Sequence, residues 1–289
     1  MTPFTVKLIA AVAVIVLSSC STQYQNTSKS YVNEIKAAVE ARTPEQQARD
    51  KHRHPIQTLA LFQVEPGMTV AEALPGGGWY TQILANYLGP KGKLYGINYA
   101  DDMWPRFGFF DQATIDNFVS RTAAFNTMVN GFTDNGIETQ GFTFATHPKE
   151  LEGTVDRVLA IRALHNLNRF ESEAGTMTQA LKVMYALLKN DGMVGVVQHR
   201  LPESASDEAA DGRRGYLKES TVIQAFENAG FVLVSKSEIN ANPNDNPGPS
   251  DIVWRLPPSL NGVGDDETKK SAMQAIGESD RMTLLFKKK

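Results

Sequence analysis

The sequence has very little cysteine and almost no net charge. Its single cysteine excludes an intramolecular disulfide, so the core must hold the fold together. The 29 lysines and arginines nearly balance the 32 aspartates and glutamates, which leaves a formal charge of −3. Because phosphate contacts need clustered positive charge, this balance gives no electrostatic reason to expect a nucleic-acid partner. The apolar share of 42% is ordinary for a globular protein and argues against a disordered chain.

Two further absences narrow the chemistry. The sequence has no G-x-S-x-G motif, so the nucleophile of an α/β-hydrolase has no evident counterpart. His52 and His54 are separated by one residue and do not share a helix face, and no cysteine or carboxylate cluster nearby completes a metal shell. We therefore expect no metal site, and we interpret His52-Arg53-His54 as a solvated helix end.

The first residues have the layout of a secretory signal. Lys7 precedes an apolar run over residues 8–17, which is too short for the roughly 20 residues of a membrane-spanning helix. The following Ser18-Ser19-Cys20 resembles the lipobox of bacterial lipoproteins, in which the cysteine is lipidated. This resemblance implies a signal peptide over 1–19, a lipid anchor at Cys20 and a location facing the periplasm. Ser21 is compatible with sorting to the outer membrane.

Two other interpretations of the first residues stay open. The segment is either a plain signal with a coincidental cysteine or the start of a cytoplasmic enzyme that merely imitates a signal. Fatty-acid labelling at Cys20 distinguishes them from a lipoprotein.

The residue pattern after the expected signal peptide predicts three parts, namely a tether, a helical extension and one α/β domain. Polar residues over 20–30 predict a flexible tether, and helix formers predict an N-terminal helical extension over 31–64. From 65 to 289, apolar strand patterns alternate with amphipathic helices, which is typical of an α/β sandwich around a mostly parallel sheet. Strands are expected at 68–73, 93–97, 137–144, 155–161, 193–197, 231–234 and 282–286, and helices at 80–88, 110–129, 176–188 and 218–228.

Two long loops, over 201–216 and 240–266, interrupt this alternation. Loops beyond strand ends are where open α/β folds usually build their sites. We expect the second loop to be a packed cover, because Ile252-Val253-Trp254 would otherwise expose apolar surface. For the first loop a disordered surface segment stays an equal alternative.

A glycine turn joins the first expected strand to its helix. Gly76-Gly77-Gly78 lets the backbone approach a ligand closely, and the next helix offers unpaired N–H groups at its N-terminus. The dinucleotide fingerprint G-x-G-x-x-G is not met, because Thr81 stands at its third glycine. Asn98 also stands where the ribose-binding acid is expected, so a nicotinamide or flavin dinucleotide is disfavoured.

Six segments together resemble the class I S-adenosylmethionine-dependent methyltransferases, and specifically a group of predicted bacterial members. The matching residues are 64–70 (Val-Glu-Pro-Gly-Met-Thr-Val), 76–81 (Gly-Gly-Gly-Trp-Tyr-Thr), 156–158 with 165–167, 187–193 and 229–231. The resemblance covers roughly residues 53–289. It implies a Rossmann-like fold with a seven-stranded, mostly parallel sheet of order 3-2-1-4-5-7-6, an antiparallel seventh strand and helices on both faces.

The same resemblance implies S-adenosylmethionine as cofactor. Glu72 is then the first-strand acid that positions the amino-acid end of the cofactor, while Asn98 takes the place of the acid that binds the ribose. Leu74 replaces the first glycine of the usual pattern. The residues expected to bind the cofactor are Glu72, Gly76, Gly77, Gly78, Tyr80, Asn98 and Thr146.

Three polar residues are candidates for the chemistry. Arg162 and His165 follow the fourth strand and His199 follows the fifth, so all three are expected at the carboxyl edge of the sheet. His165 is a candidate general base, because an unperturbed histidine titrates near neutrality. Its alternative role is to cap or pack against the following helix.

Two functions stay open at this point. One is a competent methyltransferase that acts on an acceptor which the sequence does not name. The other is a non-catalytic envelope lipoprotein that uses the same fold to bind another small molecule or a protein partner. The sequence gives no indication of oligomeric state.

Overall fold

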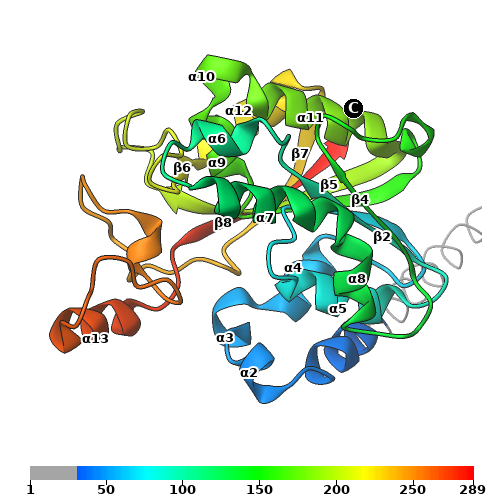
Figure 1. Ribbon diagram of the computed structural model, residues 1–289, viewed down its shortest axis with the longest axis horizontal. Coiled ribbons are helices and arrows are strands. Elements are labelled where there is room, and N and C mark those ends of the chain that lie inside the picture. Colours follow the sequence, from blue (N-terminus) through cyan, green and yellow to red (C-terminus); the bar gives the residue numbers. More distant parts are fainter. Residues whose placement is uncertain (1–30) are drawn as a thin grey trace, which may run out of the picture.

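The computed structural model describes residues 31–289, so the expected signal peptide, Cys20 and the tether lie outside the described residues (Figure 1). Its eight-stranded sheet has the order β3-β2-β1-β4-β5-β8-β7, with the short β6 beside β5. The strands are β1 (Thr69–Ala73), β2 (Lys93–Asn98), β3 (Glu138–Thr143), β4 (Val155–Ile161), β5 (Leu188–Leu201), β6 (Leu217–Lys218), β7 (Phe231–Ser237) and β8 (Arg281–Lys288).

This topology confirms the predicted Rossmann-like fold. Strands β1 to β5 pair in parallel, and β8 is antiparallel to both β5 and β7, as expected for the last strand. The two-residue β6 was not predicted and changes only the numbering of the strands that follow it. Without β6, the seven remaining strands have the order that the resemblance implies.

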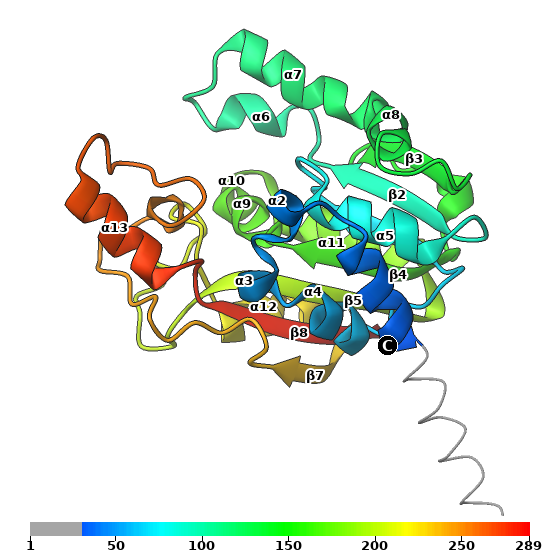
Figure 2. The same ribbon diagram turned by 90° about the horizontal axis from the view of Figure 1, so that it is seen from below.

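Helices cover both faces of the sheet (Figure 2). One buried cluster packs under α9 (Leu164–Arg169), α11 (Thr176–Leu187) and α12 (Glu219–Asn228). The other packs under residues 31–40, α4 (Pro55–Leu61), α5 (Trp79–Leu88) and α8 (Phe125–Asn130). Successive strand residues alternate between them, as Val158 and Leu159 do, because strand side chains point to opposite faces. The remaining helices are α2 (Pro44–Gln47), α3 (Asp50–Arg53), α6 (Met103–Arg106), α7 (Gln112–Ala123), α10 (Glu171–Ala174) and α13 (Glu267–Ile276).

Two element boundaries differ from the prediction. The helix expected at 110–129 is divided at Ala124 into α7 and α8, which seats the buried Phe125 side chain against Gly96 of β2 and Gly141 of β3. The strand expected at 193–197 is longer at both ends, since β5 runs from Leu188 to Leu201 and includes an irregularity where its register against β4 shifts between Val155 and Arg157. Both differences arise from tertiary packing, which local sequence pattern does not encode.

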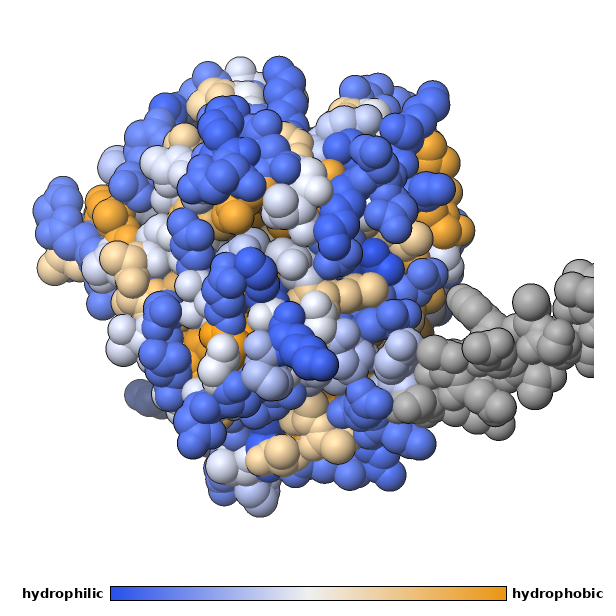
Figure 3. Space-filling view, turned by 90° about the vertical axis from the view of Figure 1, so that its right-hand side faces the viewer, coloured by the Kyte–Doolittle hydropathy of each residue, from blue (hydrophilic) through white to orange (hydrophobic). Residues whose placement is uncertain are grey.

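The surface is mainly polar. The face in Figure 3 is largely hydrophilic, and its apolar residues form small separate patches. Among residues 31–289, no helix has the length and apolar character needed to cross a membrane.

Candidate functional site

The turn after β1 leaves open space beside two of its glycines. Leu74 adopts a left-handed conformation with φ of 56°, and its N–H donates to the Ile97 carbonyl at 2.8 Å. A Cβ added to Gly77 would meet no atom within 4 Å, and one added to Gly76 would meet only the Leu74 carbonyl oxygen at 3.9 Å. Gly78 differs, since its Cβ would lie 2.7 Å from the Phe132 ring. The first two glycines therefore leave space for a ligand beside the backbone.

Two cavities border this turn, and both are lined by Pro75, Gly76 and Gly77. The larger, of about 570 Å³, extends towards the ends of β4 and β5. The smaller, of about 260 Å³, lies between the turn and helices α7 and α8. Asn98, at the carboxyl end of β2, lines the smaller cavity, and its Nδ2 donates to Thr122 Oγ1 at 3.0 Å.

Four of the expected cofactor residues line neither cavity, namely Glu72, Gly78, Tyr80 and Thr146. Glu72 is buried in β1, where its carboxylate accepts a hydrogen bond from Thr81 Oγ1 at 2.6 Å. Burial raises the pKa of Glu72 to about 7, against the opposing effects of that hydrogen bond and of Arg162. Tyr80 is buried and donates to the Arg53 carbonyl, and the exposed Thr146 is hydrogen-bonded within the turn after β3.

The structure brings the three candidate catalytic residues together in the larger cavity. His165, at the start of α9, and His199, in β5, have ring centroids 5.5 Å apart. Burial lowers the pKa of His165 to about 4, although a hydrogen bond with Gln198 acts in the opposite direction. Burial and the neighbouring His165 also hold the pKa of His199 well below its ordinary value. Both imidazoles are therefore neutral at physiological pH, and their catalytic roles stay predictions.

The interpretation of His52-Arg53-His54 as a solvated helix end was wrong for its central residue. His54 adopts a left-handed conformation with φ of 42°, and Pro55 begins α4 directly after it. This sharp corner turns Arg53 inward, so that only 2% of it is exposed. Its guanidinium lies over the Trp79 ring, 4.4 Å from the centroid, and forms one wall of the larger cavity.

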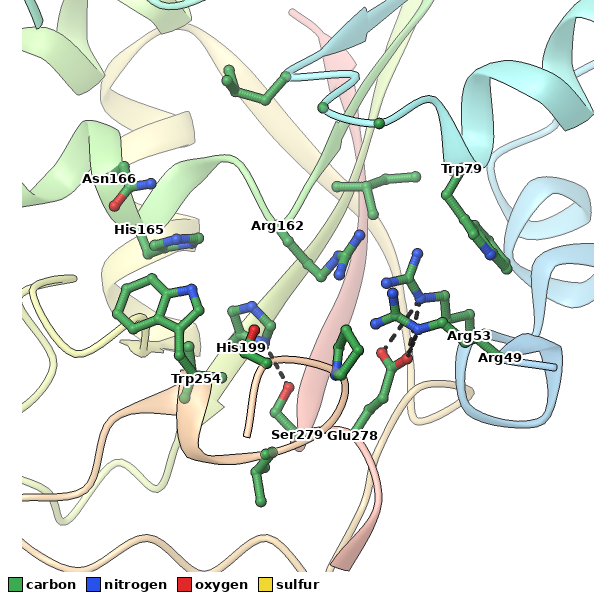
Figure 4. A pocket seen from close by; sticks show the side chains of 18 of the residues that line it. Arg49, Arg53, Trp79, Arg162, His165, Asn166, His199, Trp254, Glu278 and Ser279 are labelled. Atoms are coloured by element: carbon green, nitrogen blue, oxygen red, sulfur yellow. Dashed lines mark hydrogen bonds and ion pairs between the residues drawn. The ribbon is translucent and has the colours of Figure 1, made fainter. Parts of the chain in front are cut away.

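Three arginines from two separate segments surround one buried carboxylate, that of Glu278. Arg49 Nε lies 2.6 Å and Arg53 Nε 3.3 Å from Glu278 Oε1 (Figure 4). Arg281 Nη1 lies 3.2 Å from Glu278 Oε2. Burial alone would raise the pKa of Glu278, but the arginines outweigh it and lower that pKa to about 2. Glu278 is therefore ionised at any physiological pH.

Arg162 contributes a further guanidinium to this cavity. It follows β4 in a left-handed conformation with φ of 58°, which is uncommon for a residue other than glycine. Figure 4 shows its guanidinium and that of Arg53 pointing towards one another, close to Glu278. Burial and the neighbouring positive charges lower the pKa of Arg162 to about 10 and that of Arg53 to about 9, so both remain charged.

The loop expected to be a packed cover forms the opposite wall, as predicted. Val253 and Leu256 are buried, and the Trp254 ring lies 5.8 Å from that of His165. Arg255 ties the loop to a distant segment, since its Nη1 donates to the Tyr216 hydroxyl at 2.7 Å and its Nη2 to Asp245 Oδ1 at 2.6 Å. This packing makes the cover a fixed part of the site.

An aromatic chamber of about 430 Å³ adjoins the larger cavity. The two share Trp104, Asn166 and Trp254. The chamber is otherwise lined by three phenylalanines, two arginines and two further residues, namely Phe107, Phe109, Phe110, Arg169, Arg213, Ile252 and Asn261. In residues 31–289, no group of three or more His, Cys, Asp or Glu side chains is arranged to hold a metal ion.

Comparison with known proteins adds a likeness in architecture. No protein family and no curated protein matches this sequence. Among solved structures, an S-adenosylmethionine-dependent methyltransferase from Aquifex aeolicus is similar over 71% of this chain and 93% of its own, with 16% identity and a TM-score of 0.45. An N-methyltransferase from Haemonchus contortus, solved with S-adenosylhomocysteine, is similar over 80% of this chain and 51% of its own, with 14% identity and a TM-score of 0.44.

Proposed function

We propose that this protein is an S-adenosylmethionine-dependent methyltransferase. The observation that carries the proposal is the turn at Gly76 and Gly77, which borders two cavities and leaves open space at both Cβ positions. The turn lies at the carboxyl edge of the parallel strands, where open α/β sheets bind their ligands. Asn98 lines the smaller cavity at the end of the neighbouring strand, so the residues present fit an adenosyl group.

Each part of the site has a distinct task in this proposal. The cofactor, when bound, supplies a methyl group activated by its sulfonium. Gly76 and Gly77 allow close approach to it, and the Asn98 amide hydrogen-bonds its ribose. The larger cavity holds the acceptor, while the Val253–Arg255 segment and the residues after it keep water away. His165 and His199 are neutral and can accept a hydrogen bond from the acceptor, which orients it.

Calorimetric titration of the full chain with S-adenosylmethionine tests this function. We expect binding by the natural chain and loss of binding in Gly77→Leu, whose side chain would occupy the space beside the turn. Gly77→Ala, which adds only one methyl group, is the matched control and should bind more weakly without losing the cofactor. Thermal unfolding should show all three chains folded. No heat at millimolar cofactor with the folded natural chain would refute the proposal.

We also propose that the chain is exported and anchored through a lipid at Cys20. The support is the short apolar run over 8–17 followed by the chain's single cysteine. Metabolic labelling with a fatty acid should mark the natural chain and leave Cys20→Ala unmarked. Equal labelling of both chains, or none of either, contradicts the anchor.

A further inference from the structure

The larger cavity carries an excess of positive charge. Four guanidinium groups, those of Arg49, Arg53, Arg162 and Arg281, lie around the Glu278 carboxylate. The other carboxyl group that Arg162 influences is Glu72, whose pKa of about 7 leaves it only partly ionised at neutrality. Even a fully ionised Glu72 leaves two more positive than negative charges in this part of the described chain.

Two of these arginines also have buried nitrogen atoms without partners. Arg53 Nη1 and Arg162 Nε are both shielded from solvent, and neither has a hydrogen-bond partner among residues 31–289. Within the same residues, the Arg162 guanidinium makes no hydrogen bond and has no carboxylate within 4.0 Å. Burying a charged group is costly unless an opposite charge compensates it. An arrangement of this kind is expected where a ligand supplies the missing negative charge.

Neighbouring contacts hold the Arg53 guanidinium in place. Trp79 supports one face of Arg53, and Glu278 binds its Nε, which leaves the Nη edge unused by any described residue. Arg162 keeps a left-handed backbone that costs free energy, and such strain persists mainly at functional sites. Two planar guanidinium groups facing one another match the oxygen atoms of a carboxylate or phosphate.

The proposed cofactor does not supply this charge. S-adenosylmethionine carries one carboxylate, one ammonium and one sulfonium, so its net charge is positive. Binding of the cofactor therefore increases the excess of positive charge in the cavity. The compensating negative charge has to come from the second ligand, which is the methyl acceptor. We propose that the methyl acceptor is an anion, with a carboxylate or phosphate group that Arg53 and Arg162 bind. This inference rests on the proposed methyltransferase function.

Inorganic phosphate is the probe for the anion site. We expect phosphate to raise the melting temperature of the full chain more than sodium chloride of equal ionic strength does, because a ligand of the native state stabilises it. Arg162→Met should bind phosphate at least tenfold more weakly. Without ligand it should melt no lower than the natural chain, since Arg162 makes no hydrogen bond that the variant loses. Arg106→Met removes a guanidinium that pairs with Asp102 and Glu173 outside the cavity, and it should bind phosphate normally.

Titration with two cofactor forms distinguishes the source of the anion. We expect S-adenosylhomocysteine, which lacks the sulfonium charge, to bind more tightly than S-adenosylmethionine when phosphate is absent. Phosphate should then improve the binding of S-adenosylmethionine more than that of S-adenosylhomocysteine. Competition of phosphate with both forms would show that the arginines bind the cofactor's own carboxylate, and this would overturn the inference.

Two further results separate this inference from the proposed function. Binding of S-adenosylmethionine without any effect of phosphate overturns the anionic acceptor and leaves the methyltransferase function standing. Binding of phosphate without binding of either cofactor form overturns the methyltransferase function, and the acceptor inference with it.

Discussion

Glu72 gives the protein a pH-dependent stability whose size follows from its burial. The pKa of this carboxyl group rises from 4.5 to about 7 in the folded chain, mainly because burial penalises the charged form. Between these two values the native state keeps a proton that the unfolded state has lost, so stability falls as pH rises. The difference corresponds to about 3 kcal/mol of unfolding free energy. Glu72→Gln keeps an acceptor for Thr81 and removes this dependence.

The comparison must be made between two chains, because histidines act in the opposite direction. The pKa of His165 falls from 6.5 to about 4 on folding, so this residue adds stability as pH rises through that interval. Its contribution is common to the natural chain and to Glu72→Gln and cancels in their difference. Urea unfolding at half-unit steps from pH 4.5 to 8 should therefore show Glu72→Gln gaining about 3 kcal/mol relative to the natural chain.

A second variant tests whether the pH-dependent loss of stability comes from Glu72. Thr81→Val removes the hydroxyl that donates to this carboxylate and favours its ionised form. In that chain the pKa should move above 7, so the loss of stability should continue to higher pH. A difference between the natural chain and Glu72→Gln that does not vary with pH would refute the reasoning, since it would mean that Glu72 is ionised when buried.

Three further predictions concern packing around the site, and thermal or urea unfolding measures each. Gly195→Ala should cost about 3 kcal/mol, because its Cβ would lie 2.4 Å from the buried Phe62 ring; a loss below 1 kcal/mol would contradict this packing. Trp79→Leu should cost about 2 to 3 kcal/mol, since it removes stacking under two arginines and a hydrogen bond to the Gln46 carbonyl; unchanged stability would contradict the contacts. Leu74→Gly should change stability by less than about 1 kcal/mol, because relief of the left-handed strain offsets the lost side-chain packing; a larger loss would show that no strain is relieved.

The fold could be predicted because its signals are local. The run over 69–73, the glycine turn and the helical pattern that follows specify a β-α-β unit with short connections, and the structure contains it as β1, α5 and β2. The resemblance added the strand order, which residue patterns alone do not provide. The short β6 and the break between α7 and α8 depend on contacts with distant segments, so no local pattern indicated them.

The site was predicted only where it follows directly from strand ends. Arg162, His165 and His199 come after β4 or within β5 and do line one cavity, as the topology requires. Arg53 and Glu278 were not predicted to belong to the site. They are 225 residues apart, and each looks like an ordinary charged residue within its own segment of the sequence. The available signal was Pro55 two residues after Arg53, since a proline that begins a new helix so soon after a short charged one indicates a corner at His54.

The low pKa of the histidines and the positive charge of the cavity both bear on how the acceptor comes to lack a proton before methyl transfer. The sequence suggested His165 as a base because an unperturbed histidine titrates near neutrality, but burial lowers its pKa to about 4 and makes it a weak proton acceptor. An acceptor with a high pKa would therefore keep its proton in this cavity. An acceptor whose anionic carboxylate or phosphate oxygen itself takes the methyl group has no proton to lose and needs no such base, and Arg53 and Arg162 stabilise this anion by Coulombic attraction. The two observations are thus physically consistent with one another: a cavity that binds the deprotonated acceptor can catalyse methyl transfer with histidines that only orient it.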